Sequence, residues 1–422
     1  MVGSRVAVFS VLVLLLCLST AIAHAQGAEA GALKVGIAAV DITPTESVYM
    51  QGFSGRDKNP STGVYKEIEA SCVVFDNGVT RVGLMAIDVC KTDVSQVAKV
   101  REVAEKLSIP PQHMMINSSH SHCGPKVMGN QNPDYVPIFE ERICGLLQTA
   151  VDDLQEATLD YTVGLSTMAV NRRQLNEEGK YIGMRPEPRK PIDPEVPVLR
   201  VLSPDGQVRA VIFGYACHPT TMGGYEIGPD FVGYARDWVE AAYPGAMAMF
   251  IQGCGGDIKP RYSLPSGRFG YVLLEAKETV AEVGHELGRA VIAATAVPPS
   301  PLGTYLGGRS GMAGIPTVKQ VEDTPQGGLF PIEVQVLRIG DVYIVGLNGE
   351  ILVEIGLHIK RELADLKMWV NGYCNRDLSY IANAAAWDEG GYEITAGWTT
   401  ADAEGILVAK AVELTRELAS AH

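Results

Sequence analysis

With 422 residues, the chain is long enough to bury a large core, and its length allows either one large α/β domain or two or three structural units. The formal net charge of −14 argues against nucleic acid and anionic membrane surfaces as partners, because phosphate binding needs clustered Lys and Arg and the sequence has no basic run.

The first 25 residues have the pattern of a secretory signal peptide. Arg5 precedes an almost unbroken apolar run from Val6 to Leu18, and Ala23-His24-Ala25 is a small-x-small cleavage site. No second stretch reaches the roughly 18 apolar residues that a membrane span needs. We therefore expect residues 1–25 to be removed and residues 26–422 to form one exported catalytic domain, secreted or periplasmic, without a transmembrane anchor.

Hydrophobic periodicity predicts strands and helices in an irregular order. Predicted strands are Leu33–Val40, Ala70–Phe75, Arg81–Val89, Met114–Ile116, Leu159–Val170, Val196–Leu202, Val208–Cys217, Ala246–Ile251, Pro331–Arg338 and Val342–Leu347. Predicted helices are Asp93–Leu107, Tyr135–Leu154, Asp230–Tyr243, Tyr271–Ala294, Glu350–Leu366 and Ala401–Leu418. Turn signals such as Asp76-Asn77-Gly78 join several neighbouring strands into hairpins. Hairpins interleaved with helices predict an α/β fold with a mixed β-sheet core flanked by helices.

One long loop and the pattern of cysteines give further information about the site. The segment from Arg172 to Glu195 is rich in Pro, Gly and charge, and its length predicts a functional loop over the site rather than a linker. Seven cysteines remain after signal-peptide removal, an odd and widely spaced set without Cys-x-x-Cys, which argues against a disulfide framework or a zinc knuckle. We expect most to be buried thiols, although Cys123 and Cys217 each adjoin a candidate ligand histidine and could line the site.

The first candidate ligands follow the apolar run that ends at Ile116. His120 and His122 are two residues apart in an extended segment, so both can point into one cleft and bind a divalent metal. The following Gly124-Pro125 pair turns the chain sharply there. The alternative is that the two are ordinary surface or core histidines.

Two further candidates also stand where a strand ends. His218 ends the strand Val208–Cys217 and precedes Pro219, which stops the sheet ladder, although a hydrogen-bonded core histidine is the alternative. Glu350 follows the third hairpin and opens a predicted helix, where the helix dipole alone would favour a carboxylate. Two histidines and a glutamate at the ends of separate strands form the ligand set of a catalytic zinc site with an open position.

Three other residues have weaker signals. Tyr380 and Tyr392 are twelve residues apart in a glycine-bearing loop, where tyrosines usually pack at a half-wet surface. Arg172 ends a predicted strand and could bind a carboxylate or stabilise an oxyanion, although a surface ion pair is the commoner use of Arg. The turn Gln252–Asp257 fits neither a dinucleotide nor a phosphate-binding motif, and we interpret it as a tight turn near the cleft.

Taken in order, these motifs resemble those of the neutral ceramidases. The ordered set is His-x-His-x-Gly-Pro, Asn-Arg, His-Pro, Gly-Asp, Gly-Glu opening a helix, and two tyrosines twelve apart, and it extends over nearly the whole mature chain. The resemblance implies a catalytic domain of the neutral ceramidase type that binds one Zn²⁺ and hydrolyses the amide of N-acylsphingosine (ceramide) to a fatty acid and sphingosine.

The resemblance also implies a role for each candidate. The zinc ligands would be His120, His218, Glu350 and Tyr380. His122, Arg172 and Tyr392 would be the catalytic residues that contact the substrate head group or the developing oxyanion. The sequence does not identify the group that carries a proton to the leaving nitrogen.

The chain departs from the ceramidase pattern around the metal residues. Cys123-Gly124-Pro125-Lys126 stands where ceramidases usually have Ser-Gly-Pro-Gly-Gly, and Ala382–Asp388 replaces a Thr-Thr-x-Glu-Glu-Tyr segment. The sequence ends at His422, so we expect it to lack the C-terminal immunoglobulin-like domain of full-length ceramidases. Two alternatives stay open: a zinc amidase or esterase for another acylated sugar or lipid, and a binding protein of the same fold without turnover.

Overall fold

The computed structural model describes residues 32–53, 56, 59–261, 277–376 and 378–421. The predicted signal peptide and the first six residues of the helix predicted from Tyr271 lie outside this part of the chain. Within it, no helix has the length and apolarity to cross a membrane.

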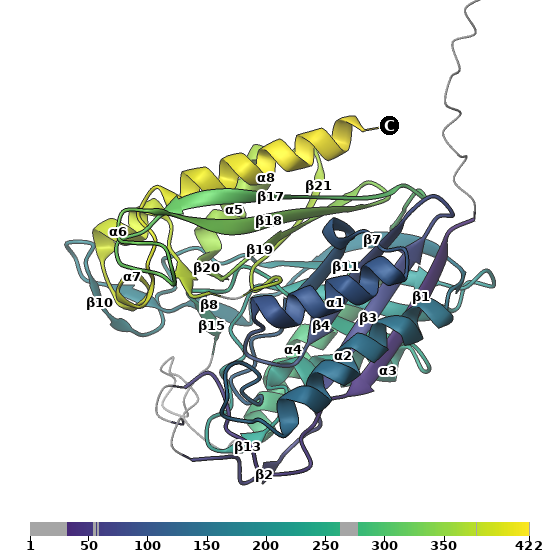
Figure 1. Ribbon diagram of the computed structural model, residues 1–422, viewed down its shortest axis with the longest axis horizontal. Helices are drawn as coiled ribbons and strands as arrows, with labels where there is room; N and C mark the ends of the chain where they lie inside the picture. Colours follow the sequence, from purple (N-terminus) through teal and green to yellow (C-terminus); the bar gives the residue numbers. More distant parts are fainter. Residues whose placement is uncertain (1–31, 54–55, 57–58, 262–276, 377, 422) are drawn as a thin grey trace, which may run out of the picture.

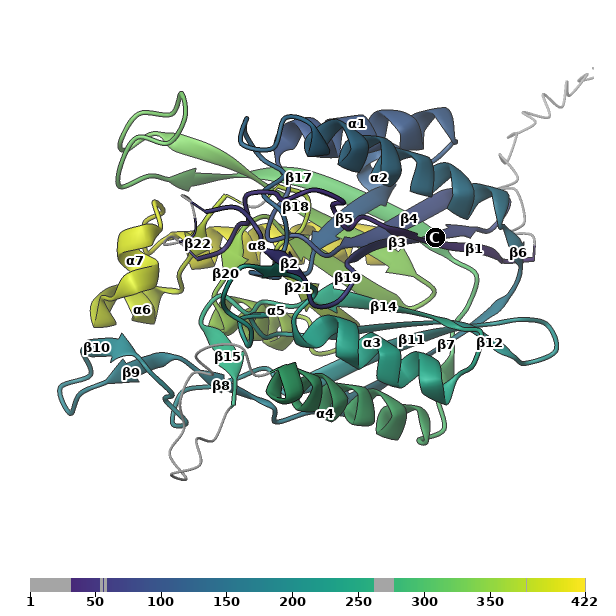
Figure 2. The same ribbon diagram turned by 90° about the horizontal axis from the view of Figure 1, so that it is seen from below.

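Three β-sheets form the centre of the molecule (Figures 1 and 2). The first has the order β5 (Met114–Ser118), β4 (Arg81–Ile87), β3 (Glu69–Asp76), β1 (Lys34–Asp41), β6 (Gln155–Glu156). The second has the order β14 (Met247–Gln252), β12 (Val208–Tyr215), β11 (Glu195–Leu202), β7 (Thr158–Leu165), β16 (Ser300–Pro301). The third has the order β17 (Leu306–Pro316), β18 (Leu329–Ile339), β19 (Val342–Leu347), β21 (Lys367–Asn371). Each sheet is antiparallel except for one parallel pair: β4 with β5, β12 with β14, and β19 with β21.

Helices cover the outer faces of the sheets. In Figure 2, α1 and α2 lie over the first sheet, whereas α3 and α4 lie on the opposite side over the second. The third sheet is covered by α8, which Figure 1 shows along β17 and β18, and by α5. Helix bounds are α1 Val94–Lys106, α2 Tyr135–Asp152, α3 Phe231–Ala242, α4 Lys277–Thr295, α5 Val353–Glu362, α6 Ala384–Glu389, α7 Tyr392–Ala396 and α8 Ala403–Ser420.

The central core lies between the inner faces of the three sheets. Successive side chains of a strand point to opposite faces, so in β3 Val73 and Phe75 enter this central core whereas Cys72 and Val74 pack under the helices. Ile344 of β19 reaches the same central core from the third sheet. Both faces of these strands are buried, which explains why their sequences are continuously apolar rather than alternating.

Most expected elements are confirmed, including the α/β class with a mixed β-sheet core flanked by helices. The predicted start of α1 is correct in detail: the Asp93 side chain accepts hydrogen bonds from the N–H groups of Ser95 and Gln96, and the Gln96 side chain accepts one from the Asp93 N–H. Six of the seven described cysteines are buried, Cys144 is half-buried, and none forms a disulfide.

Two predicted elements are wrong in their bounds, and several strands are missed, among them β17 and β21 of the third sheet. The strand predicted at Leu159–Val170 is two strands, β7 and β8 (Ala169–Asn171), and β8 pairs with β15 (Ile258–Pro260) outside the large sheets. Glu350 does not open a helix, because Glu350–Ile351 is the short strand β20 and α5 begins only at Val353. Strand β17 has four glycines in eleven residues, a composition with low β propensity, so it gave no strand signal.

Candidate metal centre

One side chain joins the carboxyl-terminal ends of three strands, one from each sheet. The Asn117 side chain, at the end of β5, accepts a hydrogen bond from the Gln252 N–H and donates to the carbonyl oxygens of Gln252 and Gly372, at 2.8, 3.2 and 2.9 Å. Gln252 ends β14 and Gly372 follows β21, so one buried amide joins strands from all three sheets. Side chains that follow these strand ends are therefore brought into one small volume.

His120, His218 and Glu350 meet at this junction. The Glu350 Oε2 atom lies 3.3 Å from the Nε2 atom of His120 and 3.3 Å from the Nε2 atom of His218. All three residues are buried, and their ligand atoms lie within 4.8 Å of one another. Each residue follows a strand of a different sheet: β5, β12 and β19, respectively.

The backbone fixes the tautomers of the two histidines. The Nδ1 atom of His120 lies 2.7 Å from the carbonyl oxygen of Cys90, and that of His218 lies 2.6 Å from the carbonyl oxygen of Gly255. A carbonyl can only accept, so each Nδ1 carries the proton and each Nε2 presents a lone pair. Two lone pairs and a carboxylate oxygen therefore face one another in a buried site.

This arrangement fits a divalent cation. The His218 Nε2 and Glu350 Oε2 atoms are buried and make no hydrogen bond in the structure, which is costly for buried polar groups without a cation between them. Imidazole nitrogen and carboxylate oxygen are ligands that zinc takes in proteins. The residues present thus match the metal site that the sequence predicts.

Electrostatics in the site also favour ligation. Burial lowers the pKa of His218 to about 3, so the imidazole is neutral at physiological pH. Burial by itself would raise the pKa of Glu350, but the neighbouring His120 and Lys91 outweigh burial and hold that pKa well below its usual range. His218 and Glu350 are therefore already in the deprotonated forms that bind a metal.

Tyr380 lies next to Glu350. Strand β22 (Tyr380–Ile381) pairs in parallel with β20 so that Tyr380 is the register partner of Glu350. The Tyr380 ring also stacks on the His218 ring at 6.4 Å, and its hydroxyl accepts a hydrogen bond of 3.1 Å from Arg172. Tyr380 is thus in the position from which a fourth ligand would come, and its ligand role stays a prediction.

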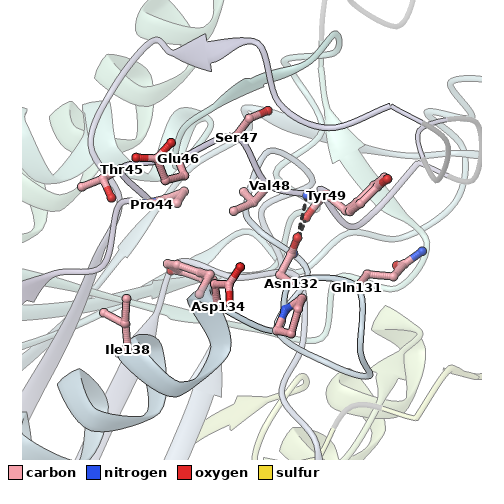
Figure 3. Close-up of a pocket in the computed structure, with 12 residues that line it drawn as sticks. Pro44, Thr45, Glu46, Ser47, Val48, Tyr49, Gln131, Asn132, Asp134 and Ile138 are labelled. Carbon is pink, nitrogen blue, oxygen red and sulfur yellow. Dashed lines mark hydrogen bonds between the residues drawn. The ribbon is translucent and has the colours of Figure 1, made fainter.

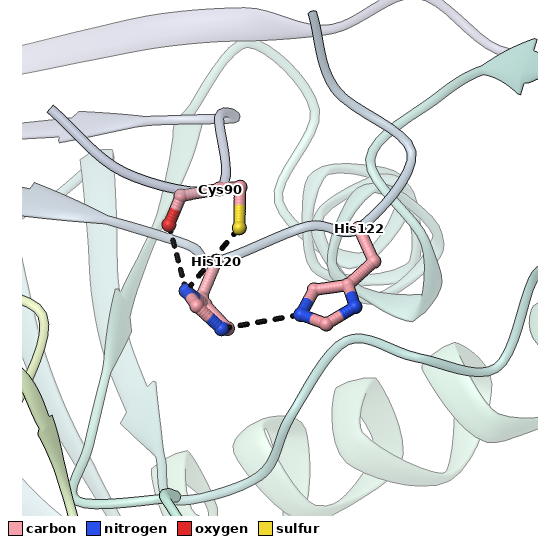
Figure 4. Close-up of side chains that lie close together, drawn as sticks. All are labelled: Cys90, His120 and His122. Carbon is pink, nitrogen blue, oxygen red and sulfur yellow. Dashed lines mark hydrogen bonds between the residues drawn. The ribbon is translucent and has the colours of Figure 1, made fainter. Parts of the chain in front are cut away.

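His122 faces the Nε2 edge of the His120 ring, opposite the edge that Cys90 contacts (Figure 4). Its Nε2 atom lies 3.2 Å from the His120 Nε2 atom, and its buried Nδ1 atom has no hydrogen-bond partner. Phe53 contacts the His122 ring edge-on at 4.8 Å, and a side chain at Gly52 would collide with that ring. The predicted pair His120 and His122 thus converges, as expected from their spacing.

Arg172 is buried and carries an ion pair. Its Nε atom donates to Glu393 at 2.9 Å, and Glu393 also accepts from Arg173. The ion pair that the sequence left as an alternative is therefore present, but it is buried rather than on the surface. Through the Tyr380 hydroxyl, Arg172 is linked to the candidate ligands.

Tyr392 lies at the rim of the site. It is the first residue of α7, it is 45% exposed, and its ring lies 5.5 Å from that of Tyr380. The predicted loop from Arg172 to Glu195 contains a hairpin of β9 (Arg173–Leu175) and β10 (Tyr181–Met184), which Figure 1 shows beside α6 and α7. This segment borders the site, as predicted, although it is partly ordered into strands.

The glycines of the turn Gln252–Asp257 explain how the backbone approaches the ligands. A Cβ atom at Gly255 would lie 2.9 Å from the Cys217 nitrogen, and one at Gly256 would lie 2.8 Å from the Glu350 carbonyl oxygen. The interpretation of this segment as a tight turn near the site is confirmed. His120 itself has a φ of 64°, a conformation that non-glycine residues adopt mainly where the surroundings enforce it.

Several contacts to the ligands were not predicted from the sequence. Cys90 accepts the His120 proton through its backbone, and Lys91 donates to Glu350 at 3.3 Å. The Tyr373 hydroxyl lies 3.4 Å from the His218 Nδ1 atom. None of these three residues belongs to a sequence motif. The spacing of the candidate histidines is the only sequence signal that points to this region.

The sequence did not single out Cys90, which is the cysteine that contacts His120. The Cys90 sulfur lies 3.7 Å from the Nδ1 atom of His120, whereas His122 faces Nε2 of the same ring (Figure 4). Since that Nδ1 proton is bonded to the Cys90 carbonyl, we assign Cys90 to orienting His120 through its backbone. Cys123 and Cys217 are buried beside the site, and burial raises the pKa of both thiols.

A separate cavity of about 210 Å³ lies at the start of α2 (Figure 3). It is bounded by the loop from Pro44 to Tyr49 and by the segment from Gln131 to Tyr135 together with Ile138. None of the predicted site residues lines it. The candidate site is therefore identified by its side chains and not by this cavity.

Comparisons with known proteins agree with the motif resemblance. No family model matches the sequence. The neutral ceramidase of Pseudomonas aeruginosa is 23% identical in an alignment of 511 residues that covers 96% of this chain and 75% of that protein. A crystal structure of neutral ceramidase from Pseudomonas aeruginosa superposes with a TM-score of 0.76 at 18% identity, covering 92% of this chain and 74% of that chain. A ceramidase complexed with C2 also superposes with a TM-score of 0.76, at 19% identity, covering 92% of this chain and 76% of that one.

Proposed function

Because the chain is related to the neutral ceramidases in sequence and has their fold, we propose that it is an exported zinc-dependent hydrolase of a linear amide, with N-acylsphingosine as the substrate. One observation carries this proposal: His120, His218 and Glu350 direct their ligand atoms at one buried point from three sheets. Tyr380 is proposed as the fourth ligand because it is the strand partner of Glu350.

Zinc bound there would supply a Lewis acid that polarises the amide carbonyl and makes hydroxide available near neutral pH. The protein contributes the orientation of the ligands, through the backbone carbonyls that hold the Nδ1 protons of the two histidines. Burial of the ligands excludes bulk water and strengthens their electrostatic effect on the substrate.

His122 is proposed to donate a hydrogen bond to the developing oxyanion. Its Nε2 atom already lies beside the His120 ligand atom, and burial, followed by the neighbouring His120, keeps the pKa of His122 well below its usual value. The ring is therefore neutral and can donate from one nitrogen. Fixed donors at such a position stabilise the charge that forms on an amide oxygen in the transition state.

Arg172 and Tyr392 complete the proposed site on the substrate side. Arg172 is fixed by Glu393 and bonds the Tyr380 hydroxyl, so it brings a positive charge close to the reacting carbonyl. Tyr392 is half-exposed beside Tyr380 and is proposed to contact the substrate head group at the rim.

Fatty-acid release from N-acylsphingosine by the purified mature protein tests this function. We expect release that stops after treatment with a zinc chelator and returns when zinc is restored. Release that a chelator does not affect would contradict the metal mechanism. A protein that holds one zinc per chain but releases no fatty acid would reject ceramide, and other acylated lipids and sugars would then be assayed with the same chelator control.

A further inference from the structure

A short turn between β4 and α1 contacts two of the proposed metal ligands. The Cys90 carbonyl accepts the His120 Nδ1 proton at 2.7 Å, and the next residue, Lys91, donates from Nζ to Glu350 Oε1 at 3.3 Å. The turn is held at both ends: Asp88 accepts a bidentate ion pair from Arg236 on one side, and the Thr92 hydroxyl donates to the Asn375 carbonyl at 2.5 Å on the other. Lys91 is therefore presented from a fixed backbone.

The two oxygens of the Glu350 carboxylate have different surroundings. Oε1 is the atom that Lys91 contacts, whereas Oε2 faces His120 and His218 at 3.3 Å and makes no hydrogen bond. The Glu350 side chain is 7% exposed and that of Lys91 is 19% exposed, so the pair is largely shielded from water. A carboxylate held in this way by an ammonium group presents one oxygen to a metal ion and keeps the other away from it.

We propose that Lys91 is a positioning residue that holds Glu350 as a one-oxygen metal ligand and so keeps a coordination position open for the substrate. This inference rests on the proposed function, because it requires a metal bound by His120, His218 and Glu350. Nothing in the motif set predicts it, since Lys91 and Glu350 are 259 residues apart in the sequence.

Lys91 could affect metal affinity in two ways, by orienting Glu350 or by its positive charge, and these two effects have opposite signs. A positive charge near a cation site weakens metal binding, so removing it would tighten binding if charge were its main effect. An outer contact that orients a ligand strengthens binding, and its removal typically costs 10- to 100-fold in metal affinity. The direction in which metal affinity changes when Lys91 is replaced therefore distinguishes a positioning role from a purely electrostatic effect.

The experiment measures zinc affinity by competition with a chelating dye in the wild type, Lys91→Met, Lys91→Gln and Lys91→Arg. We expect about 10- to 100-fold weaker binding in Lys91→Met and recovery of most of that affinity in Lys91→Arg, which restores a charged donor. Lys106→Met is the matched control, because Lys106 pairs with Glu102 at 2.7 Å on the exposed surface of α1 and should not alter zinc affinity. Thermal unfolding of the metal-free variants shows whether each is folded. If Lys91→Met is not folded, Lys91→Gln replaces it in the comparison.

A spectroscopic readout tests the coordination itself. With Co²⁺ as the probe, the visible absorption depends on the number of ligands, so we expect Lys91→Met to change that spectrum and Lys91→Arg to keep it. Unchanged or tighter zinc binding in a folded Lys91→Met variant, with an unchanged Co²⁺ spectrum, would overturn the inference. Failure of the wild type to bind either metal would instead reject the proposed function, so the two failures are distinguishable.

Discussion

At the scale of single residues, the ability of the candidate centre to bind a metal depends on which ring nitrogen of each histidine carries the proton. His120 and His218 each direct Nδ1–H at a backbone carbonyl, and this leaves Nε2 of both rings as the ligand atom. His122 lacks such a carbonyl partner, because its Nδ1 atom has no hydrogen-bond partner. This difference separates the two proposed ligands from the proposed oxyanion donor, although all three are histidines in one cluster.

Replacing His122 with Gln should impair turnover and leave metal binding intact. We expect kcat to fall about 100- to 1000-fold, the effect of losing one oxyanion donor, with a change in KM of only a few fold. Zinc content by atomic absorption should stay at the wild-type level. The control is His358→Gln, because His358 lies on α5 and contacts Glu404 of α8 at 2.8 Å, away from the centre. Loss of zinc in the His122 variant would show instead that His122 is a ligand.

At the scale of secondary-structure elements, short strands and capped helices carry the site residues. Glu350 and Tyr380 are adjacent because β20 and β22 pair in parallel, and α5 starts only after that pairing ends. The start of α5 is fixed by Asp257, whose side chain accepts from the Val353 N–H at 2.9 Å and from the Asn171 amide at 2.7 Å. Asp257 thus joins α5 to the strand that precedes Arg172.

Replacing Asp257 with Ala should destabilise the protein by about 2 kcal/mol, because a helix-capping bond is lost and the buried Asn171 amide loses an acceptor. Chemical denaturation is best followed at pH 8, above the value of about 6 to which burial raises the pKa of Asp257, so that the carboxylate is charged. Asp402→Ala is the matched control, since Asp402 precedes α8 without any side-chain capping bond and should change stability by less than about 0.5 kcal/mol. Equal effects of the two substitutions would contradict the capping role of Asp257.

At the scale of the whole molecule, the candidate metal centre lies at a junction of three sheets. Each sheet supplies one proposed ligand from the end of a strand, and the buried Asn117 amide ties the strand ends together nearby. A bound cation would therefore link parts of the chain that no single sheet contains. Binding to the native state alone stabilises it by mass action.

Metal removal should lower the midpoint of thermal unfolding. With free zinc at about 100 times its dissociation constant, the native state gains about 2.7 kcal/mol, which corresponds to a rise of a few degrees. We expect zinc to raise the midpoint of the chelator-treated wild type by this amount and to leave that of His218→Ala unchanged. An equal rise in both proteins would place the zinc at another site.

Much of the fold was predictable because its signals are local. Apolar runs located most strands of the three sheets, and the Asp93–Gln96 capping box located the start of α1. Where prediction was wrong, pairing with another segment of the chain, and not local propensity, decided the structure. Glu350 is in a strand because it pairs with the segment at Tyr380, and the glycine-rich β17 is a strand because β18 provides its ladder.

The sequence alone determined which residues stand at strand ends and which of them can bind a metal. His120, His122 and His218 are recognised from their spacing and their neighbours, and the order of the motifs indicated the neutral ceramidase fold. Only the tertiary structure decided which Nδ1 protons are held by backbone carbonyls, that Glu393 forms a buried ion pair with Arg172, and that Lys91 contacts Glu350. Periodicity and propensity act over a few residues, whereas contacts across more than 200 residues depend on how the three sheets pack against one another.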